Sequence, residues 1–433
     1  MSASRKVRFH IIHNYTSANK GWASIVLSTV KSLRKVIPNA EFTIESRDPC
    51  ADEKLYNVYG IKVLQRIVST KSKAIALLIE ALFFRVLSAL GLSPTNLAGF
   101  KELAFYNGFD MILDLSGDCL STPTHSQNLR FKFQRNFLAI GGDAYFFLLF
   151  ILLRKPIVIY AQTIGPIGFL EPLIKPLLNK VSLITVREEN SLNYLAKIGI
   201  KSNKLFLTAD PAFLLESPSN NEVEKILHKE GIDTNSPIVG MCISSETANY
   251  HFVGGEQEFA ELFANVIDSL VAKYNVQVVL VPFSIWGGHG GDDRIISKKI
   301  VGLTKKKEKV KIIEDDYSPI TLKGIINRCS IFIGSRGHSC ILALSSCVPT
   351  IAIGHNPKYH GIMKMLNQEH YVCNVKELTY DTLFSLVCHL WSNQEKIKKD
   401  LKSKTREIQG LANFNAELVV KILKERTGSS KFQ

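Results

Sequence analysis

Two kinds of pattern are missing from this sequence, and their absence removes several classes of protein. None of the eight cysteines lies three residues from another, so the Cys-x-x-Cys pairs of zinc sites and redox motifs are absent. No apolar run reaches the ~20 residues that a membrane-spanning helix requires. Residues 1–15 lack the apolar core of a signal peptide. We therefore expect reduced thiols, no bound metal and a cytoplasmic location.

Two apolar segments come closest to a spanning run. Residues 144–153 are too short, and Ala74–Leu92 is interrupted by Glu80 and Arg85. Both are typical of core or interface helices. For Ala74–Leu92, peripheral contact with the inner face of a membrane is the alternative interpretation.

Composition and charge indicate a globular protein with an anionic partner. The chain has 433 residues, of which 46% are apolar and 9% aromatic, enough for two domains with sizeable cores. A net charge of +14 favours nucleic acid, an acidic membrane surface, or phosphorylated or carboxylated ligands. The lysine runs at 305–307 and 396–399 are typical of solvated surfaces, and no RNA-binding aromatic motif accompanies them. Nucleic acid is therefore not expected as a partner.

Strand and helix patterns alternate along almost the whole chain. Apolar strands at 8–13, 110–115 and 156–162 are followed by helical or loop segments, and the pattern resumes at 238–243. This alternation predicts an α/β protein with two Rossmann-like parallel-sheet domains that face a cleft. We place the division between residues 1–215 and 216–433, with terminal helices in the second domain.

The segment Ile331–Gly337 (IFIGSRG), followed by His338, carries the sharpest chemical signal. An apolar strand ends at a turn that holds one guanidinium and one imidazole, and an apolar helix follows. Helix N-termini attract anions, and arginine binds carboxylate or phosphate through two hydrogen bonds. This arrangement predicts an anion site at the turn.

The surrounding sequence strengthens that prediction. From Tyr317 to Gln368 there is no aspartate or glutamate. The cationic or titratable residues of this stretch are Lys323, Arg328, Arg336, His338, His355, Lys358, His360 and Lys364. A stretch of this length without a carboxylate favours a cleft for a multiply charged anion.

The passage SRGHSCILALSSCVPTIAIGHNPKYHGIMKML resembles the closing signature of the polysaccharide pyruvyl transferase family. It contains the Arg-x-His pair, a small-residue helix, a Val-Pro strand and a Lys followed by Gly. Earlier pieces resemble the family in the same order. These are Asn19-x-Gly21, Ser116–Asp118, Gln162–Pro166, Arg187-Glu188-x-x-Ser191, Asp210–Phe213 and Asp292-Asp293.

This resemblance implies a fold similar to two-domain (GT-B-like) glycosyltransferases and a role in exopolysaccharide biosynthesis. It implies transfer of a pyruvyl group from phosphoenolpyruvate, used as a co-substrate without a further cofactor, onto two hydroxyls of a sugar. A pyruvate ketal forms and phosphate leaves. Residues 1–215 would serve the acceptor, with a family-variable insertion at about 50–105, and residues 216–433 the anionic donor.

Roles on the donor side follow from the chemistry of an enol phosphate. Arg336 and Arg187 are candidate anion clamps, and His338 is the candidate general acid because histidine exchanges protons near neutral pH. Lys358 is a candidate to neutralise the leaving phosphate. The expected donor-binding residues are Arg187, Ser335, Arg336, Gly337, His338 and Lys358.

Four residues are candidates for the acceptor side, namely Asn19, Asp118, His125 and Trp286. Asp118 and His125 lie in a loop after a buried strand, where sites form in this architecture. Asp118 is also a catalytic candidate, as a base or as a holder of sugar hydroxyls. Trp286 begins a glycine-rich loop and could stack on a sugar.

Other functions stay open at this point. A sialyltransferase-like enzyme, whose sugar donor is itself anionic, would also use an acid-free cleft. A catalytically degenerate family member is a second alternative. The sequence does not select among a nucleotide sugar, a lipid-linked saccharide and a finished polymer as the acceptor, and it leaves the oligomeric state open.

Overall fold

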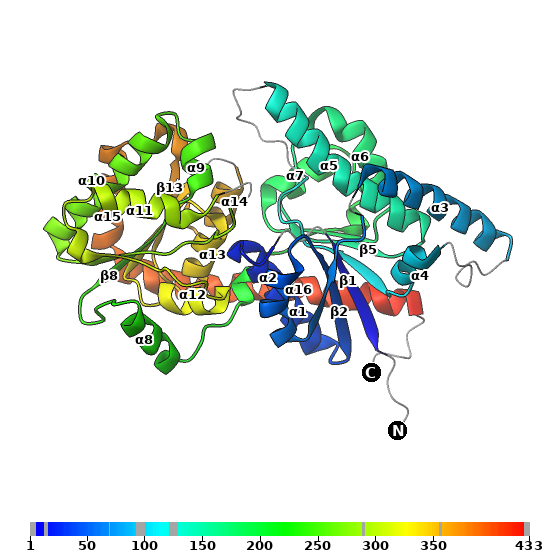
Figure 1. Ribbon diagram of the computed structural model, residues 1–433, viewed down its shortest axis with the longest axis horizontal. Coiled ribbons are helices and arrows are strands. Elements are labelled where there is room, and N and C mark those ends of the chain that lie inside the picture. The colour runs from blue at the N-terminus through cyan, green and yellow to red at the C-terminus, as the bar shows by residue number, and fades with distance from the viewer. Residues whose placement is uncertain are drawn as a thin grey trace.

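The chain forms two halves, each built around a parallel sheet with helices on both faces (Figure 1). The computed structural model describes residues 6–12, 16–68, 70–91, 100–120, 129–287, 291–354 and 357–427. The acceptor candidate His125 lies outside these ranges.

The first sheet has seven strands in the order β3-β2-β1-β4-β5-β6-β7, and every paired neighbour is parallel. The strands are β1 (Val7–Ile12), β2 (Ala40–Ser46), β3 (Ile61–Gln65), β4 (Met111–Asp114), β5 (Ile157–Gln162), β6 (Leu183–Val186) and β7 (Leu205–Leu207). Strands β4, β5 and β6 are buried at every position. Helices therefore have to cover both faces of the sheet.

Two sets of helices provide that cover. Residues of α1 (Lys20–Val36), α2 (Pro49–Tyr56) and α16 (Gln394–Thr427) share one hydrophobic core with the sheet. A second core lies on the other face, with α3 (Lys71–Ala89), α4 (Lys101–Asn107), α5 (Leu129–Leu152), α6 (Glu171–Leu178) and α7 (Glu189–Lys197). The sheet is thus the middle layer of three.

The second sheet repeats this design with six parallel strands in the order β10-β9-β8-β11-β12-β13. Its strands are β8 (Ile238–Cys242), β9 (Gln277–Leu280), β10 (Val310–Ile312), β11 (Ile331–Gly334), β12 (Thr350–Gly354) and β13 (Val372–Asn374). Its helices are α8 (Asn220–Lys229), α9 (Ser245–Tyr250), α10 (Gly255–Tyr274), α11 (Asp293–Leu303), α12 (Pro319–Ile326), α13 (Gly337–Ser345), α14 (Pro357–Met365) and α15 (Tyr380–Ser392).

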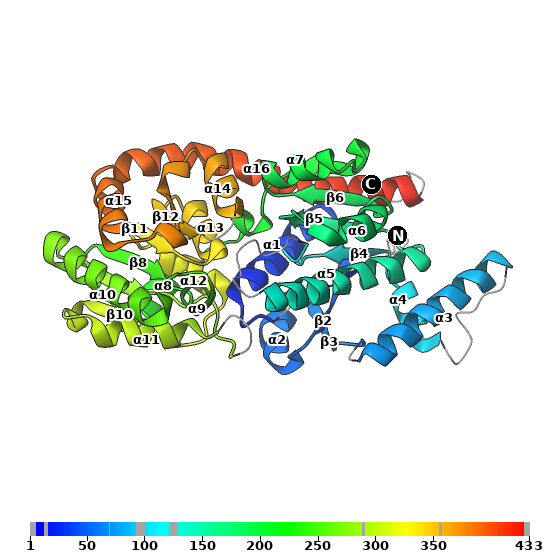
Figure 2. The ribbon, with the colours of Figure 1, turned by 90° about the horizontal axis from the view of Figure 1, so that it is seen from above.

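The last helix, α16, belongs to both halves. In its first half Thr405 donates a hydrogen bond to the Leu344 carbonyl of α13 at 3.1 Å. Further along, the Asn415 amide donates to the Ala209 carbonyl of the first half at 3.0 Å. Figure 2 shows α16 running along one edge of the molecule from the second half to the first. The chain therefore crosses between the halves twice, once near residue 216 and once within α16.

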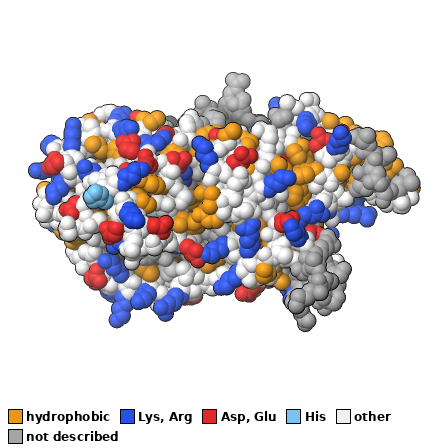
Figure 3. Space-filling model, turned by 60° about the horizontal axis from the view of Figure 1, so that its bottom comes forward, with side chains coloured by type: hydrophobic (Ala, Val, Ile, Leu, Met, Phe, Trp, Pro, Cys, Tyr) orange, Lys and Arg blue, Asp and Glu red, His pale blue; other side chains and the backbone are white. Residues whose placement is uncertain are grey.

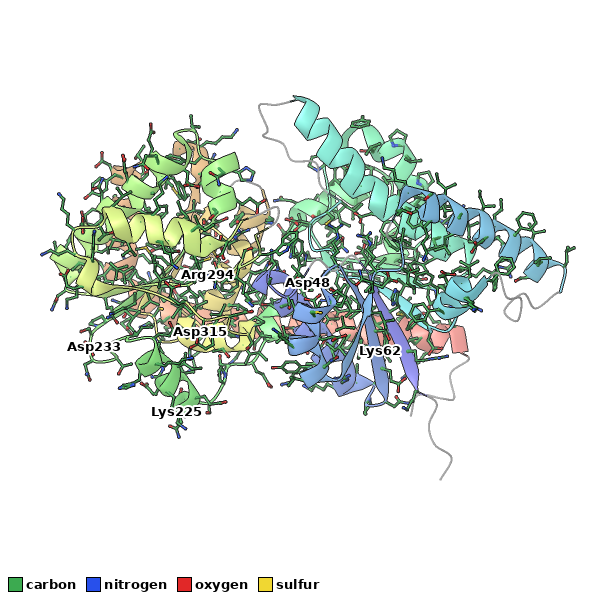
Figure 4. The ribbon with its side chains drawn as sticks, in the orientation of Figure 1. Asp48, Lys62, Lys225, Asp233, Arg294 and Asp315 are labelled. Carbon is green, nitrogen blue, oxygen red and sulfur yellow. The ribbon has the colours of Figure 1, made fainter. Side chains whose placement is uncertain are left out.

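The predicted α/β class with two parallel-sheet halves is confirmed. The strands missed by the sequence patterns are β3, β10 and β13, all at sheet edges. Edge strands are short and partly exposed, so their apolar pattern is weak. Residues 61–65, within the segment expected to be an insertion, form β3 and pair with β2. In this half the Asp48 side chain caps α2, and Lys62 lies exposed on β3 (both labelled in Figure 4).

Two properties of the structure concern membrane-spanning proteins and nucleic-acid-binding proteins. Within the described ranges, no helix is both long and apolar enough to cross a membrane. On the face drawn in Figure 3, lysine and arginine side chains are interspersed with aspartate and glutamate. A nucleic-acid groove requires a continuous basic track, and this face does not present one.

Candidate active site

The candidate residues follow the carboxyl ends of strands in both sheets, near the points where the strand order reverses. In the first sheet this point lies between β1 and β4, and in the second between β8 and β11. Ligands of doubly wound sheets bind outside the carboxyl ends of the strands at such points. The loops after β1 and β9 meet across the halves, because the Lys20 amide donates to the Phe283 carbonyl at 2.9 Å. The Nζ of Lys20 also pairs with Asp316.

His338 from the second half packs against the start of α1 in the first half. A Cβ placed on Gly21 would lie 2.6 Å from Nδ1 of His338, so only glycine leaves room for the ring in this position. Nε2 of the same ring lies 3.4 Å from Oδ2 of Asp210. The imidazole is thus held between two elements of the first half.

Asp210 joins His338 to the buried arginine of the first half. Its Oδ2 accepts a hydrogen bond from Nη1 of Arg187 at 2.5 Å, and both side chains are almost completely buried. Nε of Arg187 donates to Thr163 Oγ1 at 2.9 Å. Burial opposes the charge on Asp210, but Arg187 and His338 outweigh it and hold the pKa of this carboxyl well below its usual range. Asp210 therefore stays ionised beside the imidazole.

Lys358 and Asp118 form a second link between the halves. Nζ of Lys358, in the first turn of α14, donates to Oδ2 of Asp118 in the loop after β4. Burial again opposes the carboxylate charge, but Lys358 and Arg187 prevail and lower the pKa of Asp118 far below its ordinary value. The charges of Arg187 and His338 both act on Asp118, so these four predicted residues share one electrostatic environment.

The N-terminus of α13 opens into the same region. No side chain caps this helix, whereas Asn19, Glu188, Asp292 and other residues cap most of the remaining helices. A Cβ on Gly337 would meet Cε of Lys358 at 3.6 Å, so the first turn of α13 lies beside the lysine. Uncapped amides at a helix start attract an anion.

Arg336 is held by carboxylates of its own half. Nη2 donates to Oδ1 of Asp293 at 2.9 Å, and Nη1 donates to Oε2 of Glu246 at 2.9 Å. Burial disfavours its charge, but these two carboxylates outweigh it and raise the pKa of Arg336 above its usual range. The predicted direct grip of Arg336 on a donor stays untested. Its observed contacts fix the turn that places His338.

The remaining predicted residues in the described ranges are Ser335, Asn19 and Trp286. The buried Ser335 hydroxyl accepts from the Ser244 amide at 2.7 Å and joins β11 to β8. The Asn19 side chain accepts from the amides of Gly21 and Trp22, and thus caps α1. Trp286 is half-buried in the loop after β9.

The carboxylate-free sequence does not produce a carboxylate-free site. Arg187, Lys358 and Arg336 each have a carboxylate partner, supplied by Asp210, Asp118, and Asp293 with Glu246. These acids come from segments distant in sequence, which a local window cannot reveal. The site is therefore a set of ion pairs at an uncapped helix terminus, in which an anionic ligand would compete for the cations.

Three residues of the ion-pair network were not candidates from the sequence. Asp210 was named only within the family-like segment Asp210–Phe213, whereas in the structure it caps the short helix η6 (Pro211–Leu214) and also pairs with Arg187. Its position in the Asp-Pro-Ala-Phe segment was the available signal. Glu246 and Asp293 were not assigned to Arg336. Only the meeting of the loops after β8, β9 and β11 brings them together.

A pocket of about 280 Å³ opens between α7 and α14, beside this cluster. Its lining includes Glu189, Asn190, His360 and Lys364. Gly361, one turn after Lys358, also lines it and touches Glu188. In the described part of the chain, no three His, Cys, Asp or Glu side chains are grouped to hold a metal ion.

The sequence model of the family described as "Polysaccharide pyruvyl transferase" matches residues 19–357, which include Asp118, Arg187, Asp210, Arg336 and His338 and end one residue before Lys358. The chain belongs to the polysaccharide pyruvyl transferase family. The resemblance carried by the Arg336-x-His338 segment is thereby confirmed.

Relatives and solved structures agree with this placement. The amylovoran biosynthesis protein AmsJ of Erwinia amylovora is 22% identical over 426 residues, covering 93% of this chain and 96% of AmsJ. A UDP-GlcNAc 2-epimerase of Neisseria meningitidis bound to UDP-GlcNAc has a TM-score of 0.60 at 14% identity, with 97% of this chain and all of that chain covered. Anabaena Alr3699/HepE with UDP and glucose has a TM-score of 0.58 at 12% identity and similar coverage. These structures show a shared GT-B-like fold.

Proposed function

We propose that this polysaccharide pyruvyl transferase family member uses phosphoenolpyruvate to place a pyruvate ketal on a sugar during exopolysaccharide biosynthesis. Family membership supports the reaction class. The name of the relative AmsJ supports the pathway. The acceptor is a sugar that carries two neighbouring hydroxyls, as a nucleotide sugar, a lipid-linked saccharide or a polymer.

The proposed reaction moves two protons and breaks one carbon–oxygen bond. The methylene carbon of phosphoenolpyruvate gains a proton and becomes a methyl group, and the central carbon becomes electron-poor. One sugar hydroxyl attacks that carbon, and the bond to phosphate breaks. The second hydroxyl then closes the ketal. Of the two hydroxyl protons lost, one balances the new methyl group and the other leaves with phosphate.

Donor binding is assigned to Lys358, Arg187 and the amides at the start of α13. All three are close to His338, and none requires a rearrangement of Arg336 and its two carboxylates. An incoming phosphate or carboxylate would replace Asp118 at Lys358. The carboxylate of Asp118 would thereby be released to accept a proton from the sugar hydroxyl.

His338 is the proposed acid that protonates the methylene carbon. The ionised Asp210 lies 3.4 Å from Nε2, and Gly21 fixes the position of the ring from the other side. Arg336 is a positioning residue in this scheme, because it holds the turn before α13 without facing the donor. The pocket between α7 and α14 would accommodate part of the acceptor, with polar side chains suited to sugar hydroxyls.

One observation carries this proposal most strongly. Lysine, histidine and arginine from both halves meet at the start of α13, a helix that no side chain caps. This arrangement suits a ligand with two anionic groups, and phosphoenolpyruvate has a carboxylate and a phosphate.

The test is a calorimetric titration of the full chain with phosphoenolpyruvate. We expect wild-type binding and roughly 10- to 100-fold weaker binding by Lys358→Ala, since a charge-assisted contact contributes about 1.5–3 kcal/mol. Lys364→Ala is the matched control. Lys364 lies on the same helix, but it is exposed and pairs with Glu189, so its loss should change the affinity less than twofold.

Two results would reject the proposal. Absence of wild-type binding would remove phosphoenolpyruvate as the donor and move the anionic-sugar alternative to first place, to be titrated with an anionic nucleotide sugar. Equal losses for Lys358→Ala and Lys364→Ala would show that overall charge, rather than this site, attracts the ligand.

A further inference from the structure

Helix α3 buries one apolar face and exposes another. Leu77, Ala81 and Phe84 point into the core against α4 and α5. On its outer side lie Ile75, Ile79, Leu82, Phe83, Val86 and Leu90 at the C-cap, each between 50% and 71% exposed. Their spacing of three, four or seven residues places them along one side of the helix. We call these six residues the α3 stripe.

The α3 stripe is part of a wider concentration of exposed apolar side chains. Across the described residues, nine of the fourteen exposed large hydrophobic side chains lie in one helical layer of the first half. Besides the stripe, these are Leu148 on α5, Phe169 in the short helix η4 (Gly168–Leu170) and Leu173 on α6. Isolated exposed apolar residues are ordinary, but a continuous stripe indicates an interaction surface.

Shape and charge identify the kind of partner. Both ribbon views show α3 at the outer end of the first half, remote from the second half, where it protrudes (Figures 1 and 2). A protruding helix cannot form a groove for a peptide. Lys71 and Lys73 begin the helix, and Glu80 is the one acid in its sequence. Lys73 pairs with Glu102 of α4 at 3.3 Å, whereas Lys71 lies on the side of the stripe.

We propose that the α3 stripe inserts into the surface of an anionic lipid bilayer, with Lys71 at the start of α3 contacting the headgroups. An interfacial helix buries its apolar side by about 5–10 Å while basic residues attract anionic lipids. A chain with a net charge of +14 is attracted to such a surface, whereas a second copy would carry the same charge and repel it.

The consequence for function is access to an acceptor held at a membrane. A lipid-linked saccharide is one of the acceptors left open. A chain docked through α3 would encounter it by diffusion along the membrane surface rather than through the bulk solution. This consequence rests on the proposed function, whereas the bilayer contact does not depend on the identity of the donor.

Co-sedimentation of the full chain with vesicles tests the contact. We expect binding to vesicles of phosphatidylcholine mixed with phosphatidylglycerol, weaker binding at high salt, and little binding to phosphatidylcholine alone. The variant Ile79→Ser, Phe83→Ser, Val86→Ser should bind about 100-fold more weakly, since it removes three apolar side chains from the contact.

The chain offers a matched control. Val58, Val253 and Ile295 are at least as exposed as the three stripe residues, but they lie elsewhere on the surface. Replacement of these three by serine should leave vesicle binding within about twofold of wild type. Urea unfolding of both triple variants verifies that they fold, and titration with phosphoenolpyruvate verifies separately that the donor site is intact.

Three outcomes would overturn the proposal. The first is a wild-type chain that stays in the supernatant with anionic vesicles. The second is a stripe variant that binds as strongly as wild type. The third is light scattering that gives a wild-type dimer and a monomeric stripe variant, which would make the stripe an interface between copies of the chain.

Discussion

The two halves each bury an arginine just after a strand, and the two arginines are used differently. Arg187 follows β6 and pairs with Asp210, which also faces His338 from the opposite half. Arg336 follows β11 and pairs with Asp293 and Glu246, both from its own half. One arginine is part of a network that spans the cleft. The other fixes the local structure of a single half.

This difference distinguishes an arginine that can bind a ligand from one that positions a neighbouring turn. A charge with a single shared partner can be redirected to a ligand when that partner moves, whereas a charge held by two carboxylates is expensive to redirect. The sequence had named Arg336 and Arg187 as candidate anion clamps and Lys358 as a further donor-binding residue. In the proposed scheme Arg187 and Lys358 keep that role, and Arg336 supports the turn before His338.

Removal of Asp210 should have the largest effect. Asp210→Ala leaves Arg187 buried without its partner, and we expect the free energy of unfolding to fall by about 3–5 kcal/mol. Glu246→Ala is the matched variant of the other network. Arg336 keeps Asp293 there, so the loss should be about 1 kcal/mol. Urea denaturation measures both, and equal losses would contradict the contrast between the networks.

A change at Gly21 should weaken the cross-cleft network without removing any charge. Gly21→Ala places a methyl group 2.6 Å from Nδ1 of His338, so the ring must leave its present position beside Asp210. We expect about tenfold weaker binding of phosphoenolpyruvate by calorimetry. Gly302→Ala on α11 is the control, because nothing lies within 4 Å of its added methyl group. If the Gly21→Ala variant binds phosphoenolpyruvate as tightly as wild type, the position of the His338 ring has no role in donor binding.

Acid should weaken the Lys358–Asp118 link. The pKa of Asp118 is lower in the folded chain than its ordinary value of about 4. A carboxyl of this kind stabilises the fold above its unfolded-state pKa, and the contribution is lost as the pH falls through the folded-state pKa. The Tm difference between wild type and Asp118→Asn should therefore be largest near neutral pH and shrink below about pH 4. A pH-independent difference would exclude an ionic link.

The exposed ion pair between Lys364 and Glu189 should contribute least to the free energy of unfolding. It also joins α14 to α7 across the halves, but both side chains are more than half exposed. Glu189→Gln should change the free energy of unfolding by less than about 0.5 kcal/mol, because solvent screens the attraction. A larger change in urea denaturation would mean that the cross-half contacts depend on surface charge as well as on the buried network.

Much of the fold was accessible from sequence, because central strands are buried on both faces and read as apolar runs. Met111–Asp114 and Ile157–Gln162 are examples that were predicted within one residue. The edge strand Val310–Ile312 follows a lysine-rich segment and was missed. Its three residues carry too little pattern to compete with the surrounding charge.

The site was accessible in part. Residue types that handle anions drew attention to Arg187, His338 and Lys358, and these do converge. Their carboxylate partners could not be predicted, because pairing is decided by which loops meet after folding. The acid-free stretch Tyr317–Gln368 misled for the same reason, since Asp118 and Asp210 approach it from the other half.

The two crossings between the halves lie side by side, and this limits how the cleft can open. Gln409 of α16 donates a hydrogen bond to the Phe213 carbonyl at 3.3 Å, just before the first crossing. A 34-residue helix is a stiff rod about 51 Å long. The halves therefore cannot slide apart or turn independently about a flexible tether. Opening of the cleft is restricted to a hinge rotation of one half relative to the other near Phe213 and Gln409. The extent to which α16 bends would set the angle of this rotation.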